Sequence, residues 1–364
     1  MWSNLPFDVL AEIYSFLAPD SFACAKSACR NWHESAKYLT PTDARHKNPP
    51  WFIALPNRDR GLFCYAYKPI DKIWYMLPLD FIPKQFLPIS AIDGLILLRL
   101  TSSTSLQLAI CNPFTRQFRV LPGLNLTRTH PAVGVELKPK SGFKIYVAGG
   151  MSNGPSGGAS YEPTVEMYDS ICDKWEIIGS MPIEFAVRLT VWSPNESVCC
   201  NGVLYWMTSA RAYSVMGFEM GTNYWKELSV PMADRLEFAA LVPRNGKLTL
   251  IGGKCGGNAC IWELGDADRW FMIEMVEFYL GMRFLGGKGC WGSTKCVGSN
   301  GVVILYKDLG SGMIVWREIP EKKGKWEWFW IEGCCSIRGK ELQNLQIRGL
   351  LIHPNRNLSS LLNA

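Results

Sequence analysis

The spacing of hydrophobic positions changes once along the chain, near residue 50. Before that point, five apolar residues follow the i, i+1, i+4, i+7 and i+8 spacing of a helix with one apolar side: Val9, Leu10, Ile13, Phe16 and Leu17. After it, short runs of Val, Ile, Tyr, Phe and Trp alternate with clusters of Gly, Asn, Asp and Pro roughly every ten residues. The pattern predicts a small helical unit followed by a large all-β domain.

The helical unit carries more apolar surface than it can cover by itself. A second helix is expected after Pro19, capped by Asp20 or Ser21, and its apolar stripe continues through Phe22, Ala25, Cys29 and Trp32. Three small helices in about forty residues have too little volume to bury two such stripes. We therefore expect part of the apolar surface to bind a partner, most simply a helical protein.

The β region contains internal repeats. Six aromatic positions recur at intervals of about fifty residues: Trp74, Phe118, Trp175, Trp225, Trp270 and Trp326. In three of the units another aromatic residue precedes the marker by seven positions, and two units contain a double glycine, at Gly149 with Gly150 and at Gly252 with Gly253. Glycine pairs of this kind allow two backbones to approach closely.

These repeats resemble kelch repeats, over roughly residues 50 to 336. The resemblance implies a mainly β fold, a kelch-type β-propeller of about six blades preceded by the small helical unit, with aromatic side chains filling the gaps between blades. Five or seven blades remain open from the sequence. A propeller must also close into a ring. The apolar run Leu350 to Ile352 is expected to supply the closing strand, next to Trp51 to Leu55.

The N-terminal helices resemble the F-box. The pattern matches at nine positions: Leu5, Pro6, Val9, Ile13, Leu17, Phe22, Cys29, Arg30 and Trp32. It departs at Ala18 and Ala28, where a proline and a valine are usual. An F-box followed by a kelch propeller resembles the plant F-box/kelch-repeat proteins, and the predicted order is a three-helix F-box (1–42), a linker (43–50), the propeller (51–336) and a C-terminal segment (337–364).

The resemblance implies the substrate-recognition subunit of an SCF (Skp, cullin, F-box) ubiquitin ligase. In such a complex the F-box docks on the Skp adaptor, which binds the cullin, and the propeller holds the target protein. The residues expected to contact the adaptor are Leu5, Pro6, Val9, Ile13, Phe16, Leu17, Phe22 and Trp32. A receptor of this type performs no bond chemistry and requires no cofactor; it raises the effective concentration of target lysines near a charged ubiquitin carrier.

Composition indicates which partners and which cellular compartment to expect. The 364 residues carry a net charge of +6, but the Lys and Arg residues are scattered, which does not indicate nucleic-acid binding. No apolar run is long enough to cross a membrane, and the N-terminus does not look like a secretory signal. We expect a nuclear or cytoplasmic protein whose 13 cysteines are reduced, with the adjacent pairs at 199–200 and 334–335 lying in strands.

A basic residue recurs ten to thirteen positions after each aromatic marker. The six are Lys84, Arg128, Arg188, Arg235, Arg283 and Arg338. In a propeller this phase falls on the passage from an outer strand to the next inner strand, so these side chains are candidates for a cationic collar that holds an acidic or phosphorylated target segment. The alternative is that they bind neighbouring backbone carbonyls or solvent.

Two other functions remain open. Some kelch propellers are copper enzymes, but that chemistry needs clustered ligands, and the four histidines are far apart in the sequence: His33, His46, His130 and His353. A catalytic cysteine would need a neighbouring base, and no such pair is visible. A scaffold that binds the adaptor without directing degradation has the same sequence features as a receptor.

Overall fold

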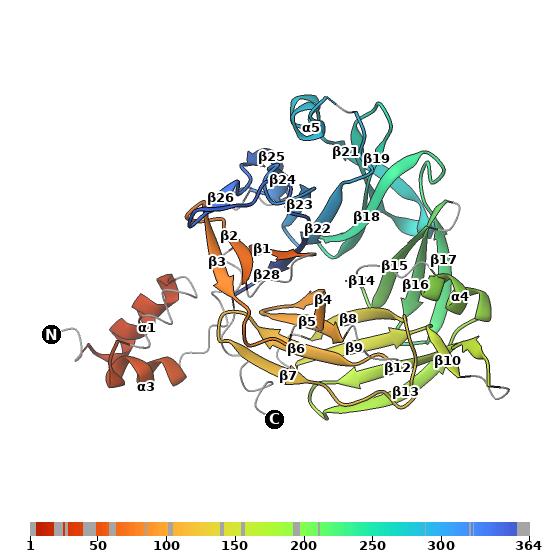
Figure 1. Ribbon diagram of the computed structural model, residues 1–364, viewed down its shortest axis with the longest axis horizontal. Coiled ribbons are helices and arrows are strands. Elements are labelled where there is room, and N and C mark those ends of the chain that lie inside the picture. The colour runs from red at the N-terminus through yellow and green to blue at the C-terminus, as the bar shows by residue number, and fades with distance from the viewer. Residues whose placement is uncertain are drawn as a thin grey trace.

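The computed structural model describes residues 5–17, 25, 28–38, 49–57, 63–83, 86–100, 105–138, 142–153, 157–191, 197–209, 212–287, 289–319, 322 and 324–354. Six four-stranded antiparallel sheets stand in a ring around a common axis (Figure 1). Their innermost strands contact one another around the whole ring, in the order β28, β4, β8, β14, β18, β22 and back to β28. The fold is a six-bladed β-propeller, and the mainly β, six-bladed architecture predicted from the sequence is confirmed.

Each blade runs from the axis outward. Blade 1 contains β28 (Ile347–Ile352), β1 (Trp51–Pro56), β2 (Phe63–Lys68) and β3 (Ile73–Pro78). Blade 2 contains β4 (Phe86–Ile92), β5 (Leu95–Leu100), β6 (Leu108–Asn112) and β7 (Gln117–Val120). Blade 3 contains β8 (Ala132–Lys138), β9 (Gly142–Ala148), β12 (Thr164–Asp169) and β13 (Lys174–Ser180).

The remaining blades repeat this order. Blade 4 contains β14 (Ser197–Cys200), β15 (Val203–Ser209), β16 (Tyr213–Glu219) and β17 (Tyr224–Ser229). Blade 5 contains β18 (Leu236–Arg244), β19 (Lys247–Lys254), β20 (Ala259–Leu264) and β21 (Trp270–Met275). Blade 6 contains β22 (Lys295–Ser299), β23 (Val302–Tyr306), β24 (Met313–Glu318) and β25 (Trp326–Ile331).

Short additional elements connect the blades. Two hairpins, β10 (Met151–Asn153) with β11 (Ala159–Tyr161) and β26 (Ser336–Ile337) with β27 (Lys340–Glu341), lie outside the blades, as does the turn η3 (Asp266–Asp268). Helices α4 (Ile183–Val191) and α5 (Phe278–Leu285) occupy passages from an outermost strand to the next innermost strand. Because strands in a blade are antiparallel, these passages lie on one face of the ring, which we call the α4/α5 face, whereas β1 begins on the opposite face.

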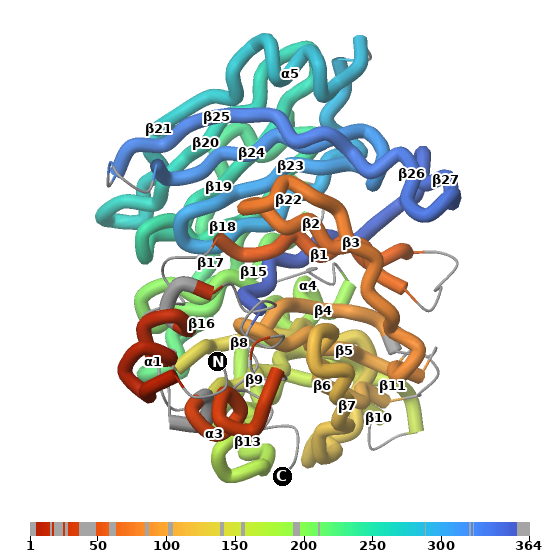
Figure 2. The backbone as a smooth tube through the Cα atoms, turned by 90° about the vertical axis from the view of Figure 1, so that its left-hand side faces the viewer, coloured from red at the N-terminus to blue at the C-terminus, as the bar shows by residue number. Residues whose placement is uncertain are grey.

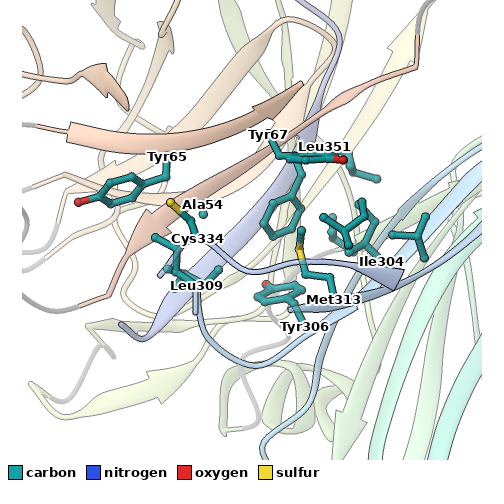
Figure 3. Close-up of a cluster of buried hydrophobic side chains, with 14 of the residues drawn as sticks. Ala54, Tyr65, Tyr67, Ile304, Tyr306, Leu309, Met313, Cys334 and Leu351 are labelled. Carbon is teal, nitrogen blue, oxygen red and sulfur yellow. The ribbon is translucent and has the colours of Figure 1, made fainter. Parts of the chain in front are cut away.

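The ring closes through the C-terminal part of the chain. Strand β28 pairs with β1 in a register that runs from Trp51 opposite Ile352 to Pro56 opposite Ile347. This is the pairing that the apolar run Leu350 to Ile352 predicts, so the strands of the propeller reach residue 352 rather than stopping near 336. Figure 3 shows a buried cluster between blades 1 and 6, which includes Tyr67 and Tyr306. The ring centroids of Phe52 and Tyr306 in this cluster lie 5.2 Å apart.

The six aromatic markers all lie in outermost strands. In blades 1, 3 and 4 the marker stands directly opposite the aromatic residue seven positions earlier, as Tyr168 stands opposite Trp175 with ring centroids 5.4 Å apart. The residue two positions before the marker has a positive φ in each of these turns, and Asp173 has φ 53°. The seven-residue spacing is therefore the length of a tight hairpin that brings two rings together across the third and fourth strands.

The double glycines are needed where the chain approaches another segment closely. A Cβ on Gly150, whose φ is 96°, would lie 2.7 Å from the Thr129 carbonyl oxygen. A Cβ on Gly253 would lie 2.4 Å from the Trp291 ring. No real side chain tolerates contacts this short, so the glycines make room for the passage that leads into the same blade (Thr129) or the next one (Trp291).

Gly349 in the closing strand allows a steric test of the ring. A Cβ there would lie 2.4 Å from the Phe52 ring and 2.9 Å from the Tyr306 ring. We expect Gly349→Ala to lower the free energy of unfolding by roughly 1–3 kcal/mol, because the two rings must shift within a packed core. Gly123→Ala is the matched control, since its Cβ would meet nothing within 4 Å. Equal urea midpoints for the two variants would contradict the expectation.

The twelve cysteines in the described part of the chain are free thiols. Cys199 and Cys200 lie in β14, as predicted, whereas Cys334 and Cys335 lie in the connection after β25, so the strand prediction is wrong for the second pair. Burial raises the pKa of Cys64 and of Cys200 to about 12, and the pKa of Cys199 to about 11. These three thiols are protonated at neutral pH and pack as small apolar side chains.

The helices of the described segments are too short or too polar to cross a membrane.

Candidate docking surfaces

Two helices of the N-terminal domain lie beside the ring rather than within it (Figure 1). Helix α1 (Phe7–Phe16) begins after Pro6, whose extended conformation (φ −57°, ψ 153°) precedes the first turn, and Asp8 places a carboxylate near the positive end of the helix dipole. Helix α3 (Arg30–Tyr38) follows. The predicted second helix falls largely on residues outside the described segments.

The inner side of α1 forms a small core with α3. Leu10 and Tyr14 are buried. The Tyr14 hydroxyl donates a hydrogen bond of 2.7 Å to the Trp32 carbonyl oxygen, and the two rings meet edge to face at 5.7 Å. Burial raises the pKa of Tyr14 above its usual range. This contact fixes the angle between α1 and α3, and the pair does not depend on the propeller for its core.

The predicted adaptor residues divide into two groups. Leu5, Leu17 and Trp32 are half-buried and pack against Leu10 and Tyr14. Pro6 and Val9 are exposed and Ile13 is half-buried. Phe22 and the side chain of Phe16 lie outside what the structure describes. The first group therefore shapes the helical domain itself, whereas the second faces outward.

The outward face of α1 stays apolar. Phe7 is 50% exposed and Val9 is 39% exposed. Ile13 stands one helical turn after Val9, so the two lie on the same side of the helix. The cluster that buries Leu10 draws all its members from the N-terminal helices, and Ile13 is not sealed against the propeller. An apolar stripe thus remains accessible to another protein.

Arg128, the second residue of the predicted collar, is a structural residue, and its assignment to a target-binding collar is wrong. Its side chain and that of Glu166 are fully buried, and its Nη2 lies 2.8 Å from Glu166 Oε1. Nη1 donates to the carbonyl oxygens of Thr164 and Gly149. The guanidinium therefore ties the passage into blade 3 to strands of the same blade and reaches no solvent.

Two further collar residues are neutralised by acidic partners. Arg188, on α4, pairs with Glu227 of blade 4. Arg283, on α5, pairs with Glu332 and lies over the Trp330 ring, with its Cζ 4.2 Å from the ring centroid. Both pairs join a helix on the α4/α5 face to the following blade, and they leave little net charge there.

Two further collar residues are exposed. Arg235 is exposed in the turn before β18, and Arg338 is exposed in the turn between β26 and β27. Lys84 lies outside the described residues. The predicted position in the chain, between an outer strand and the next inner strand, is right for all five described residues: Arg128, Arg188, Arg235, Arg283 and Arg338. The burial of Arg128 and the ion pairs of Arg188 and Arg283 nevertheless prevent a collar of free charges.

Among the described residues, no group of three or more His, Cys, Asp and Glu side chains has the geometry of a metal site. Of the histidines, His33, His130 and His353 lie within the described segments, on α3, in the passage before β8 and after β28.

A larger exposed apolar surface was not predicted from the sequence. Of the eighteen exposed large apolar side chains in the described part of the chain, seven fall between residues 271 and 282, in β21 and α5. The stretch "WFMIEMVEFYLGM" contains the signal that reveals them, because an outermost strand is expected to alternate apolar and polar residues, and this one does not.

Comparisons with known proteins agree with this architecture. The F-box domain matches residues 2–42, and the F-box associated beta propeller domain matches residues 52–307. Similar proteins from Arabidopsis thaliana include F-box only protein 6, which is 25% identical over 98% of this chain and 74% of its own length. Protein UNUSUAL FLORAL ORGANS is 24% identical over 92% of this chain and 79% of its own length.

Another relative from Arabidopsis thaliana is named an F-box/kelch-repeat protein, and it is 26% identical over 90% of this chain and 84% of its own length. The domain that matches the propeller is nevertheless the F-box associated propeller. The kelch resemblance of the repeats is thus a loose one, confined to the blade period and the aromatic and glycine positions.

Proposed function

Because this chain belongs to the plant-type F-box proteins that carry an F-box associated β-propeller domain, we propose that it is the substrate-recognition subunit of an SCF ubiquitin ligase. Its F-box docks on a Skp-type adaptor, and through that adaptor on a cullin. Its propeller holds the target protein. In this proposal the chain acts in the nucleus or the cytoplasm.

The observation that carries the proposal is that two sides of α1 are apolar and only one of them is used in the core of the helical domain. One side of this helix, with Leu10 and Tyr14, builds the core of the helical domain. The neighbouring side keeps Val9 exposed and Ile13 half-buried. When a partner covers the second apolar side of such a helix, binding is stabilised by about 25 cal/mol for each Å² of apolar surface removed from water.

Such a receptor acts by position and not by chemistry of its own. Binding the target next to a charged ubiquitin carrier turns an encounter in solution into one within a single assembly, which raises the effective concentration of the reacting groups. The six-bladed ring suits this task, because the pairing of β28 with β1 closes it and buried side chains join neighbouring blades.

Adaptor binding is tested on the outward side of α1. We expect Val9→Asp with Ile13→Asp to weaken binding to a purified plant Skp adaptor by at least about tenfold, because two carboxylates would enter an apolar contact. The measurement is a titration by calorimetry. Ile177→Asp, at an exposed isoleucine of β13, is the matched control and should bind like the wild type.

The double variant must also keep its helical domain folded. The far-ultraviolet circular dichroism of the isolated chain checks this, since Val9 and Ile13 lie outside the buried pair Leu10 and Tyr14. Undiminished adaptor binding by the folded double variant would refute the proposed docking side.

The alternative, a scaffold that binds the adaptor without directing degradation, predicts a different result in cells. For a true receptor, the half-life of a bound target should lengthen when Val9→Asp and Ile13→Asp are introduced. For a scaffold, the half-life should not change although the target is still bound.

A further inference from the structure

Helix α5 is held rigidly by its inner side. Leu280, Phe284 and Leu285 are buried, and the Phe284 ring stacks on Trp291 at 5.8 Å. Trp291 is itself fixed, because its indole Nε1 donates to the Gly257 carbonyl oxygen at 2.8 Å. The Lys307 ammonium donates to the Phe284 carbonyl oxygen at 3.0 Å. The helix therefore presents its outer side in a defined position.

The outer side of α5 is apolar as well. Phe278 is 68% exposed, Tyr279 is 70% exposed and Met282 is also exposed. The sequence of the helix is FYLGMRFL, and its one charged residue, Arg283, is drawn away to Trp330 and Glu332. A helix that is apolar all round is ordinarily covered on all sides. Here the protein itself covers half of it.

Strand β21, which leads into α5, also exposes apolar side chains, on both of its faces. The exposed residues are Phe271, Met272, Ile273 and Met275. β21 is the outermost strand of blade 5, and a register shift in its pairing with β20 leaves Ile273 without an opposite residue. Such a bulge makes an outer edge irregular and disfavours the addition of another strand. The edge therefore favours side-chain contact, such as that with a helix, over strand addition.

The exposed apolar area of this surface lies in the range of the largest apolar patches on monomers. Three aromatic side chains, each able to bury about 150–250 Å² and each about two-thirds exposed, present roughly 300–500 Å². Met282 adds to this area, whereas Met272 and Met275 stand opposite Trp262 and Cys260 on the other face of the blade. The largest apolar patch on a typical monomer is about 300–600 Å², and patches at the upper end are commonly functional.

The negative charge of this surface favours a basic partner. The whole chain has a net charge of +6, yet the stretch from residue 270 to residue 282 holds two carboxylates, Glu274 and Glu277, and no Lys or Arg. Both glutamates are exposed, and neither forms an ion pair with another described residue. A partner that brings apolar side chains together with Lys or Arg complements this surface, whereas an acidic partner is repelled.

The surface lies apart from the N-terminal helices. Figures 1 and 2 show α5 protruding from the ring at a place away from α1 and α3. Helix α5 lies on the α4/α5 face, and the chain enters the propeller at β1 on the opposite face. The two proposed docking surfaces are therefore separate parts of the molecule (Figures 1 and 2).

On these grounds we propose that the surface formed by β21 and α5 is the target-docking site of the propeller, and that it takes an amphipathic helix of the target that carries Lys or Arg beside its apolar residues. This inference rests on the proposed receptor function and gives it a substrate class. Binding buries the rings of Phe278 and Tyr279 and brings basic side chains to Glu274 and Glu277.

The test uses the full chain and two fluorescein-labelled 14-residue peptides of one helical pattern, one of Leu and Lys and the other of Leu and Glu. We expect the Leu/Lys peptide to bind at least tenfold more tightly, with an affinity that falls as salt rises. Phe278→Ser with Tyr279→Ser should weaken its binding at least tenfold, and Glu274→Lys with Glu277→Lys should do the same. Fluorescence anisotropy measures both.

Tyr224→Ser is the matched control, because Tyr224 is 61% exposed on the outermost strand of blade 4. All replaced residues are exposed, so the melting temperatures should stay within a few degrees of the wild type. Equal binding of the two peptides, or equal binding by the Phe278 and Tyr279 variant and the Tyr224 variant, would overturn the assignment.

This outcome is separable from the receptor function. A chain that binds the Skp adaptor but shows no difference between these variants refutes the docking site alone. A chain that shows the difference but does not bind the adaptor refutes the receptor function alone.

Discussion

A chain that ends at Leu345 is expected not to form a closed propeller. It lacks β28, which supplies four buried aliphatic side chains to blade 1: Ile347, Leu350, Leu351 and Ile352. At about 1.5–3 kcal/mol for each, their loss removes roughly 6–12 kcal/mol. That is comparable to the whole stability of a typical protein, about 5–15 kcal/mol. The shortened chain also exposes the edge of β1, which invites aggregation.

Size-exclusion chromatography and the thermal unfolding of tryptophan fluorescence measure this effect. We expect aggregates or a chain without a cooperative transition. Addition of a peptide of residues 346–354 should restore the monomer, because the missing strand only needs to pair with β1. The same peptide with Leu350→Asp and Ile352→Asp should not. A shortened chain that remains monomeric and melts like the full chain would show that β28 is dispensable.

Arg128→Met is expected to lower the free energy of unfolding by about 3–5 kcal/mol, because it leaves the carboxylate of Glu166 buried without its cation. Both side chains of the pair are fully buried. Glu166 also accepts hydrogen bonds from the backbone N–H groups of Asn125 and Leu126, at 2.7 and 3.2 Å. The carboxylate therefore holds the passage into blade 3, and it becomes an uncompensated charge when the arginine is removed.

Urea denaturation compares this variant with a surface control. Arg188→Met removes a pair with Glu227 in which both side chains are more than one-third exposed, and it should cost no more than about 1 kcal/mol. A double variant, Arg128→Met with Glu166→Gln, should be less destabilised than Arg128→Met alone, since no charge is then buried. Similar midpoints for Arg128→Met and Arg188→Met would contradict the assignment of Arg128 as a buried structural residue.

The candidate sites were only partly predictable, and the reason differs between them. On α1, periodicity marks the apolar positions Val9, Leu10 and Ile13 but does not say which of them the domain uses for itself. The angle between α1 and α3, fixed by Tyr14 and Trp32, makes that choice. On the propeller, the phase of Arg128 and Arg188 was correct, but the acidic partners that neutralise them lie about forty residues away in sequence.

The local pattern by itself determined the blades of this protein. Alternation, turn residues and the seven-residue distance from Tyr168 to Trp175 are properties of a single hairpin. They can therefore be recognised in the sequence without knowing the rest of the fold. The apolar run from Leu350 to Ile352 likewise marked the strand that closes the ring. The six aromatic markers indicated about six blades, and the six four-stranded sheets of the structure establish that number.

The tertiary structure alone decided which surfaces are free. Exposure depends on what other segments cover: the same kind of apolar run is buried in β28, where β1 and its neighbouring blades enclose it, and open in β21, where the blade ends. The net charge of a surface also depends on the tertiary structure. The charge of Arg128 is neutralised because the fold places Glu166 beside it. Hydrophobic periodicity depends on residues that are close in sequence. Burial and ion pairing depend on residues that come together only after the ring has closed.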